Sequence, residues 1–438
     1  MNLQQSNHST HAVNSNNPNY TAPLVVLTSL FFMWGFLTAL NDILIPHLKA
    51  VFTLSYTEAM LVQFVFFAAY FIVSLPAGNL VEKIGYKRGI ILGLLISGVA
   101  CLVFYPAASM RNYPLFLTAF FFLAAGITIL QVAANPFVAA LGKPETASSR
   151  LNLTQAFNSL GTTIAPLVGA MLILSTSVLS PEQMTELTPE KLEAYKNREA
   201  ASVQLPYLFL AGSLFLIAVI IGFFKLPQVS SAGEEGAENS EITHFESVYK
   251  YKHLILGAIA IFVYVGAEVA IGSFLVNYLG EKEVAGLTEE QAGKYVSLYW
   301  GGAMVGRFIG AVVMRKVSPS KILGFNAIIA GLLVITTILS SGTIAMWSIL
   351  AVGLFNSIMF PTIFTLSLAG LGKHTGKGSG VLCMAIVGGA ILPVLQGYFA
   401  DNIGIKLAFF LPVLCYIYIS YFGFAGSDSS YLKKVRSH

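Results

Sequence analysis

The chain has 438 residues, of which 55% are hydrophobic and only 11% are charged, and its formal net charge is +4. Soluble globular proteins carry about 25% charged residues, so this composition excludes a soluble globular protein and predicts one covered by lipid. The basic residues are spread over many short loops and predict no nucleic-acid partner.

Twelve stretches of the chain are apolar enough to cross a membrane, which takes about 20 residues of helix. The sequence therefore predicts an all-α membrane protein with twelve transmembrane helices. The predicted spans are residues 23–46, 59–81, 89–109, 113–141, 152–178, 204–226, 253–280, 290–316, 320–341, 344–371, 377–400 and 404–426. A charged stretch, 227–252, predicts a cytoplasmic linker between an N-terminal six-helix half over 21–226 and a C-terminal half over 253–427.

Loop charges orient these spans, because Lys and Arg are concentrated in cytoplasmic loops. With both termini inside, sixteen basic residues fall on the cytoplasmic side and eight outside. This bias predicts a multi-pass protein of the plasma membrane (bacterial inner membrane) with cytoplasmic termini. Residues 1–20 have no Lys or Arg and no apolar core, so they predict a disordered tail rather than a signal peptide. Residues 428–438 form a second predicted cytoplasmic tail.

The first span carries an ionisable residue, which is costly in a membrane and is generally retained for function. Asp42 shares a helical face with Thr38, and Asn41 lies beside it. Burial favours a protonated carboxyl group, whereas a bound cation keeps it ionised. The sequence therefore predicts Asp42, Asn41 and Thr38 as a cation-coupling group, with a structural acid paired to a neighbouring helix as the alternative.

Spans four and five carry amide side chains at helical spacing. Gln131 and Asn135 lie one turn apart on the fourth span, and Gln155 and Asn158 lie about one turn apart on the fifth. Amides can simply hold helices together, but stripes on adjacent spans predict the lining of a wet cavity that binds a polar solute. Trp34, on the first span, could stack on a sugar ring or serve only as a packing residue.

The second half adds fewer polar residues. Glu268 is predicted to bind a cation or sugar hydroxyls, with pairing to Arg307 as the alternative. Tyr264, one turn earlier, and Asn356 complete the predicted substrate-binding set, and Gln396 is a further polar residue within a span.

Small residues and prolines predict local helix geometry in this half. Gly302, Gly306 and Gly310 are four apart and predict close approach of a neighbouring helix. Pro361 and Pro393 predict kinks in spans ten and eleven.

Several segments together carry a resemblance to a known family. They are FFMWGFLTALNDILIPHL (31–48), VAANPFVAALG (132–142), SRLNLTQAFNSLG (149–161), YVGAE (264–268) and FPTIFTLSLAGLG (360–372). The chain resembles the major facilitator superfamily and, within it, the fucose/glucose–galactose permease branch. Gly78–Arg88 is similar to the superfamily's loop motif, with Glu82 where an Asp is usual.

The resemblance implies alternating access, with Asp42 as the coupling carboxylate. Proton-coupled fucose permeases carry a Glu just before the AANPF segment, where this chain has Gln131. The departure favours the glucose/galactose members, some of which use Na⁺. Asp42 and Gln131 are then expected as oxygen ligands of Na⁺.

The predicted function is therefore import of a hexose, most simply glucose or galactose, with Na⁺ favoured over H⁺. The expected partners are the sugar, the cotransported cation and the lipid bilayer; the protein is expected to be a monomer with no resident cofactor. H⁺-coupled uptake of fucose or N-acetylglucosamine is the alternative, and a drug or metabolite exporter of the same fold is more remote. A membrane enzyme or receptor is the most distant. Zinc spacing, GxSxG and P-loop motifs, which would indicate an enzyme, are absent from the sequence. The sequence also predicts no sizeable extramembrane domain through which a receptor would pass a signal.

Overall fold

The computed structural model describes residues 20–52, 56–173, 183, 186–224 and 247–427, with side chains described outside 40–63, 166–173, 199–203 and 289–290. Every regular element within these ranges is a helix. The predicted tails, apart from residue 20, and most of the predicted linker lie outside the described residues.

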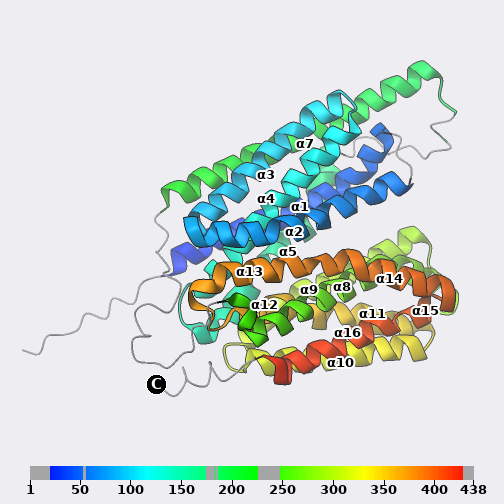
Figure 1. Cartoon of the computed structure of the whole chain (residues 1–438). Helices are drawn as coiled ribbons and strands as arrows, with labels where there is room; N and C mark the ends of the chain where they lie inside the picture. Colours follow the sequence, from blue (N-terminus) through cyan, green and yellow to red (C-terminus); the bar gives the residue numbers. More distant parts are fainter. Residues whose placement is uncertain (1–19, 53–55, 174–182, 184–185, 225–246, 428–438) are drawn as a thin grey trace, which may run out of the picture.

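The first half consists of six long helices that pack as one bundle, coloured blue to green in Figure 1. They are α1 (Thr21–Phe52), α2 (Tyr56–Ile84), α3 (Tyr86–Ser109), α4 (Tyr113–Ala140), α5 (Ala147–Ile173) and α7 (Pro189–Phe223), with a short 3₁₀ turn η1 (Pro144–Thr146) before α5. Within this bundle α3 packs against α4 and α7, and α1 packs against α5.

The second half forms a second bundle beside the first, coloured green to red in Figure 1. Its helices are α8 (Lys252–Gly280), α9 (Glu289–Val313), α10 (Pro319–Leu339), α11 (Gly342–Asn356), α12 (Met359–Leu368), α13 (Thr375–Met384), α14 (Gly388–Ile403), α15 (Ile405–Ala408) and α16 (Phe410–Tyr421). Shorter turns η2 (Val248–Lys250), η3 (Gly372–His374), η4 (Ala385–Val387) and η5 (Phe422–Gly426) connect or end them.

Eleven stretches of the described residues are long and apolar enough to cross a membrane. The pairs α11 and α12, α13 and α14, and α15 and α16 each form one such stretch. α5 is the remaining long helix, and the side chains of its last residues, 166–173, lie outside the described residues. The predicted fold class, an all-α membrane protein, is confirmed.

The sixth span differs from its prediction at one end. The apolar run begins at residue 204, but α7 begins at Pro189, directly after Thr188, whose side chain accepts a hydrogen bond from a first-turn amide. Arg111 holds the added turns through an ion pair with Glu193, with 2.8 Å between nitrogen and oxygen. Hydropathy detects where a helix enters lipid, so it cannot detect a polar continuation of the helix outside it.

The tenth span is broken between α11 and α12. Pro361 has no amide proton, and its ring displaces the carbonyl four residues earlier, that of Ser357. The freed Ser357 carbonyl accepts a hydrogen bond from Arg307 Nε of α9 at 3.0 Å. The kink predicted at Pro361 is therefore present as a break in the helix, and Pro393 lies inside α14, after the irregular turn η4.

The two halves touch closely where α2 meets α13. A Cβ atom on Gly78 would lie 2.8 Å from the Gly376 carbonyl oxygen, and one on Gly380 would lie 2.6 Å from that of Ser74, so only glycines allow this approach. Glu82 Oε1 accepts a hydrogen bond from the Lys377 amide at 2.9 Å. That amide is in the first turn of α13, so the carboxylate lies at the positive end of the helix dipole.

Further bonds between the halves lie near the same end. Ser148 Oγ is 2.6 Å from Thr365 Oγ1, and Ser149 Oγ donates to the Ala311 carbonyl at 2.5 Å. The halves thus meet at the end that carries the turns after α2, α4 and α9, which we call the closed end. The loop charges predict that the closed end faces the cytoplasm.

Candidate functional site: a polar layer between the halves

Amide atoms without hydrogen-bond partners lie on α4, a helix that is buried along most of its length. Gln131 Nε2 donates to the Tyr70 hydroxyl of α2 at 2.9 Å, but Gln131 Oε1 has no partner. Asn135 is fully buried, and neither of its amide atoms has a partner. An unpaired buried polar group costs about 1–3 kcal/mol, so these atoms favour binding of water or of a polar solute.

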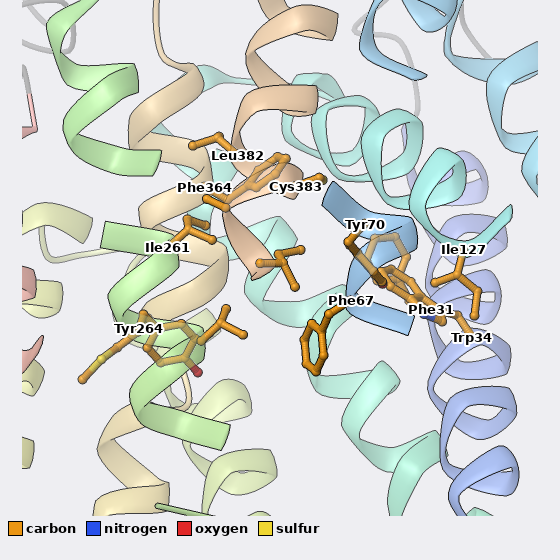
Figure 2. Packing of buried hydrophobic residues seen from close by; sticks show 14 of the residues in the cluster. Phe31, Trp34, Phe67, Tyr70, Ile127, Ile261, Tyr264, Phe364, Leu382 and Cys383 are labelled. Carbon is orange, nitrogen blue, oxygen red and sulfur yellow. The ribbon is translucent and has the colours of Figure 1, made fainter. Parts of the chain in front are cut away.

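The amides of α4 lie next to the second half. Tyr70 lies near Cys383 of α13, and Ser379 Oγ donates to the Val132 carbonyl at 2.8 Å. Figure 2 shows Tyr70 with Phe31 on the side of the first half, and Tyr264 on the side of the second. A ligand bound at the amides of α4 would therefore lie near both halves.

The two predicted amide residues of α5, Gln155 and Asn158, make contacts with different helices. Asn158 Nδ2 donates to the Phe31 carbonyl of α1 at 2.9 Å, where Gly35 leaves room for the α5 backbone. Gln155 is 6% exposed, and its carbonyl accepts a hydrogen bond from Arg307 at 3.3 Å. Asn158 thus joins two helices of one half, whereas the backbone carbonyl of Gln155 contacts the other half.

Arg307 connects the two halves through one guanidinium group. Its Nε donates to Ser357 within the second half, while its Nη1 donates to the Gln155 carbonyl and to Ser159 Oγ of α5. A planar guanidinium presents five donors in a fixed arrangement. Because Pro361 frees the Ser357 carbonyl, this carbonyl can fix the guanidinium through Nε within the second half. The Nη1 group then remains available to bond α5 of the first half.

Glu268 lies on α8 near this arginine. Its residue is half-buried, and its Oε1 is buried without a hydrogen-bond partner. Arg307 interacts with it electrostatically, and Tyr264 lies beside it. Among the described residues, this carboxylate and guanidinium place opposite charges at the boundary of the halves.

Asn356 lies at the centre of a network of tyrosines. Its Nδ2 donates to the Tyr299 hydroxyl at 3.0 Å, and its Oδ1 accepts from the Tyr416 hydroxyl at 2.8 Å. The Tyr264 hydroxyl donates to the Asn356 carbonyl at 3.1 Å. All four residues are buried, so the network fixes α8, α9 and α16 around α11. Gln396 of α14 is also fully buried, but neither of its amide atoms has a partner.

Comparison with known proteins gives the family. The model of the Major Facilitator Superfamily matches residues 26–385. The chain belongs to this superfamily. A glucose/galactose transporter of Brucella abortus biovar 1 (strain 9-941) is 56% identical over 424 residues, covering 97% of this chain and 98% of that protein. An L-fucose-proton symporter of Escherichia coli (strain K12) is 37% identical over 407 residues, covering 92% and 93%.

A solved structure gives the same assignment for the fold. The major facilitator FucP in its outward conformation matches with a TM-score of 0.87 and 37% identity, covering 93% of this chain and 99% of that chain. The predicted family is therefore confirmed, and both named relatives are transporters rather than enzymes.

Not every predicted site residue of this major facilitator is described. The side chains of Asn41 and Asp42 lie outside the described residues. Thr38 Oγ1 donates to carbonyls of its own helix at 3.0 and 3.1 Å. Trp34 is 6% exposed and packs on Phe31 with 5.5 Å between ring centroids, so its indole belongs to the packed interior.

Two residues of the polar layer are missing from the predicted site. Arg307 had a signal, because it was the basic residue left inside a span once the loops were assigned. Tyr70 had none, because a tyrosine in an apolar helix does not reveal which neighbour its hydroxyl meets. Each makes its hydrogen bond to a residue distant in sequence. The packing of α2 on α4 brings Tyr70 to Gln131, and the packing of α9 on α5 brings Arg307 to Ser159.

Proposed function

We propose that this major facilitator is a secondary active transporter that imports a hexose, glucose or galactose, together with a cation. The unpaired amide atoms of Gln131 and Asn135 carry the proposal. A sugar presents neutral hydroxyl groups that both donate and accept hydrogen bonds, and a carboxamide does the same. The 56% identical glucose/galactose transporter supports the choice of sugar.

Na⁺ is the favoured coupling ion. Gln131 is neutral, so it cannot carry a proton as the Glu of the fucose permeases could. Its unpaired Oε1 is an oxygen ligand of the kind that a hard cation prefers. Asp42 is proposed as the charged ligand, with Asn41 and Thr38 beside it on α1. H⁺ coupling with fucose or N-acetylglucosamine is the second candidate, favoured by the 37% identical L-fucose-proton symporter.

Transport proceeds by alternating access of the two halves. Contacts at the closed end shut the polar layer from that side, so we propose that the sugar and cation enter from the opposite side. Separation of α2 from α13 and of α5 from α9 then releases them at the closed end. One positive charge moving through 100 mV yields about 2.3 kcal/mol, which supports roughly a fifty-fold concentration ratio of the sugar.

The test is labelled-glucose uptake into proteoliposomes under one gradient at a time. An inward Na⁺ gradient at equal pH should drive accumulation, and an inward proton gradient without Na⁺ should not. Accumulation with protons alone would contradict Na⁺ coupling and return Asp42 to the role of proton carrier. Uptake of none of glucose, galactose, fucose or N-acetylglucosamine under either gradient would favour the exporter function.

Variants separate coupling from sugar binding. Asp42→Asn should abolish accumulation while leaving downhill sugar exchange intact, and Asp401→Asn, at an exposed position of α14, should change neither. Gln155→Ala should weaken sugar binding, whereas Gln204→Ala should not, because the Gln204 amide donates to Ser109 on α3. Undiminished accumulation by Asp42→Asn would refute its coupling role.

A further inference from the structure

A groove of about 400 Å³ lies on the second half, between α9, α10, α11 and the break that follows α11. Its walls are apolar and come mainly from Ile309, Val313, Val317, Phe325, Leu354 and Ile358. Four of these, on α9, α10 and the turn between them, are exposed large hydrophobic residues. The groove therefore opens outward, toward lipid, rather than into the polar layer.

One end of the groove is basic. Lys321, in the first turn of α10, lines it and is exposed, and Arg315 and Lys316 lie in the turn just before. Among the described residues of the second half, acidic side chains lie either within α8, at Glu268, or in the turns and helix ends on the side away from the closed end. No described acid of this half therefore neutralises the three basic residues.

We propose that this groove binds an anionic phospholipid, with an acyl chain along the apolar walls and the phosphate at Lys321, Arg315 and Lys316. The occupant must be apolar over most of its length and negative at one end, which is the chemistry of such a lipid. Basic pockets between transmembrane helices bind acidic lipid head groups in this way. A transmembrane helix is about 10 Å wide and would contact the rim of the groove without filling it.

The floor of the groove lies directly against the break in the tenth span. Gly306 and Gly310 form part of the floor, and a Cβ atom on either would collide with Ser357 or Ile358 at the break. Arg307, the neighbour of Gly306, bonds the Ser357 carbonyl from the other side. An acyl chain in the groove thus supports the segment that holds the arginine in place against α5.

Native mass spectrometry of the full chain in detergent tests the proposal. The purified protein is titrated with phosphatidylglycerol and, separately, with phosphatidylcholine carrying the same chains. Val317→Phe narrows the groove, and its matched control is Val312→Phe, an exposed apolar position outside it. Lys321→Gln removes a head-group contact, and its control is Lys250→Gln, an exposed lysine elsewhere in the half.

We expect phosphatidylglycerol to bind in preference to phosphatidylcholine. Lys321→Gln should weaken phosphatidylglycerol binding about five-fold, the equivalent of about 1 kcal/mol per basic residue near an anionic surface. Val317→Phe should weaken binding of both lipids, and both controls should match the unmodified protein. Equal binding by Val317→Phe and Val312→Phe would overturn the proposal, as would displacement of phosphatidylglycerol by equimolar glycerol 3-phosphate, which would indicate an anion site without an acyl chain.

Discussion

Replacing Arg307 with Lys tests whether the guanidinium holds the halves together. Lysine keeps a positive charge near Glu268 but lacks the planar group that reaches three acceptors at once. The bond to Ser357 lies within one half and survives opening of the closed end, whereas the bonds to Gln155 and Ser159 do not. The substitution should therefore change the balance between conformations more than the fold.

The expected magnitude follows from the two bonds between halves. A hydrogen bond from a charged group contributes about 1.5–3 kcal/mol, and lysine can retain at most one of the two. At the lower value, loss of one bond destabilises the closed arrangement by roughly 1.5 kcal/mol, and loss of both bonds destabilises it by roughly 3 kcal/mol. The equilibrium constant for opening at the closed end should rise about ten- to 150-fold.

Cys383 supplies a native probe for this shift. It is fully buried on α13 beside Tyr70, so opening of the closed end should expose its thiol to a maleimide. With Cys101 and Cys415 replaced by Ala, the alkylation rate of Cys383 reports the open fraction. The rate should increase in Arg307→Lys in proportion to that fraction.

The matched control is Arg150→Lys. Arg150 also binds backbone carbonyls, but all of them, at Val138, Ala139 and Lys143, belong to its own half. This variant should lower thermal stability without changing alkylation of Cys383. Equal alkylation rates in Arg307→Lys and the unmodified protein would refute the inter-half role of Arg307.

Three further predictions concern other contacts. Gln131→Glu should leave sugar uptake near normal at acidic pH, where the new carboxyl group is neutral, and reduce it at alkaline pH, where it is ionised; a flat pH profile of initial uptake rates would contradict this. Gly161→Ala should lower unfolding stability by about 1–3 kcal/mol, because its Cβ would collide with a carbonyl of α1, whereas Gly212→Ala, with nothing within 4 Å, should have little effect in a thermal unfolding assay. Glu82→Gln should raise Cys383 alkylation only two- to five-fold, because a carboxylate at a helix N-terminus typically contributes about 0.3–1 kcal/mol.

The sequence predicts the spans and the fold class well because the cost of burying polar groups in lipid acts on each segment separately. Predicted spans 113–141 and 253–280 match α4 and α8 to within one residue. The glycine row in α9 was also predictable, because helix spacing alone places Gly302, Gly306 and Gly310 on one face, and each packs closely on α11 or the break that follows it.

The pairing of polar residues could not be predicted in the same way. Asn356 and Gln131 both carry amide side chains inside apolar helices. Both the nitrogen and the oxygen of the Asn356 amide are hydrogen-bonded, whereas the oxygen of the Gln131 amide has no partner. The difference depends on which helices face each one, and this is a property of the packed bundle. The break at Ser357 was predictable from Pro361, but its use by Arg307 was not.

The extension of α7 beyond its apolar run has a practical consequence. Its 35 residues make a helix about 52 Å long at 1.5 Å per residue, against a hydrocarbon core about 30 Å thick. About 20 Å of α7 therefore extends beyond the hydrocarbon core, and Glu193 in this part is paired with Arg111 of the same half. An antibody fragment or fused domain attached there would give imaging a fixed landmark while leaving the contacts between the two bundles free to form and separate.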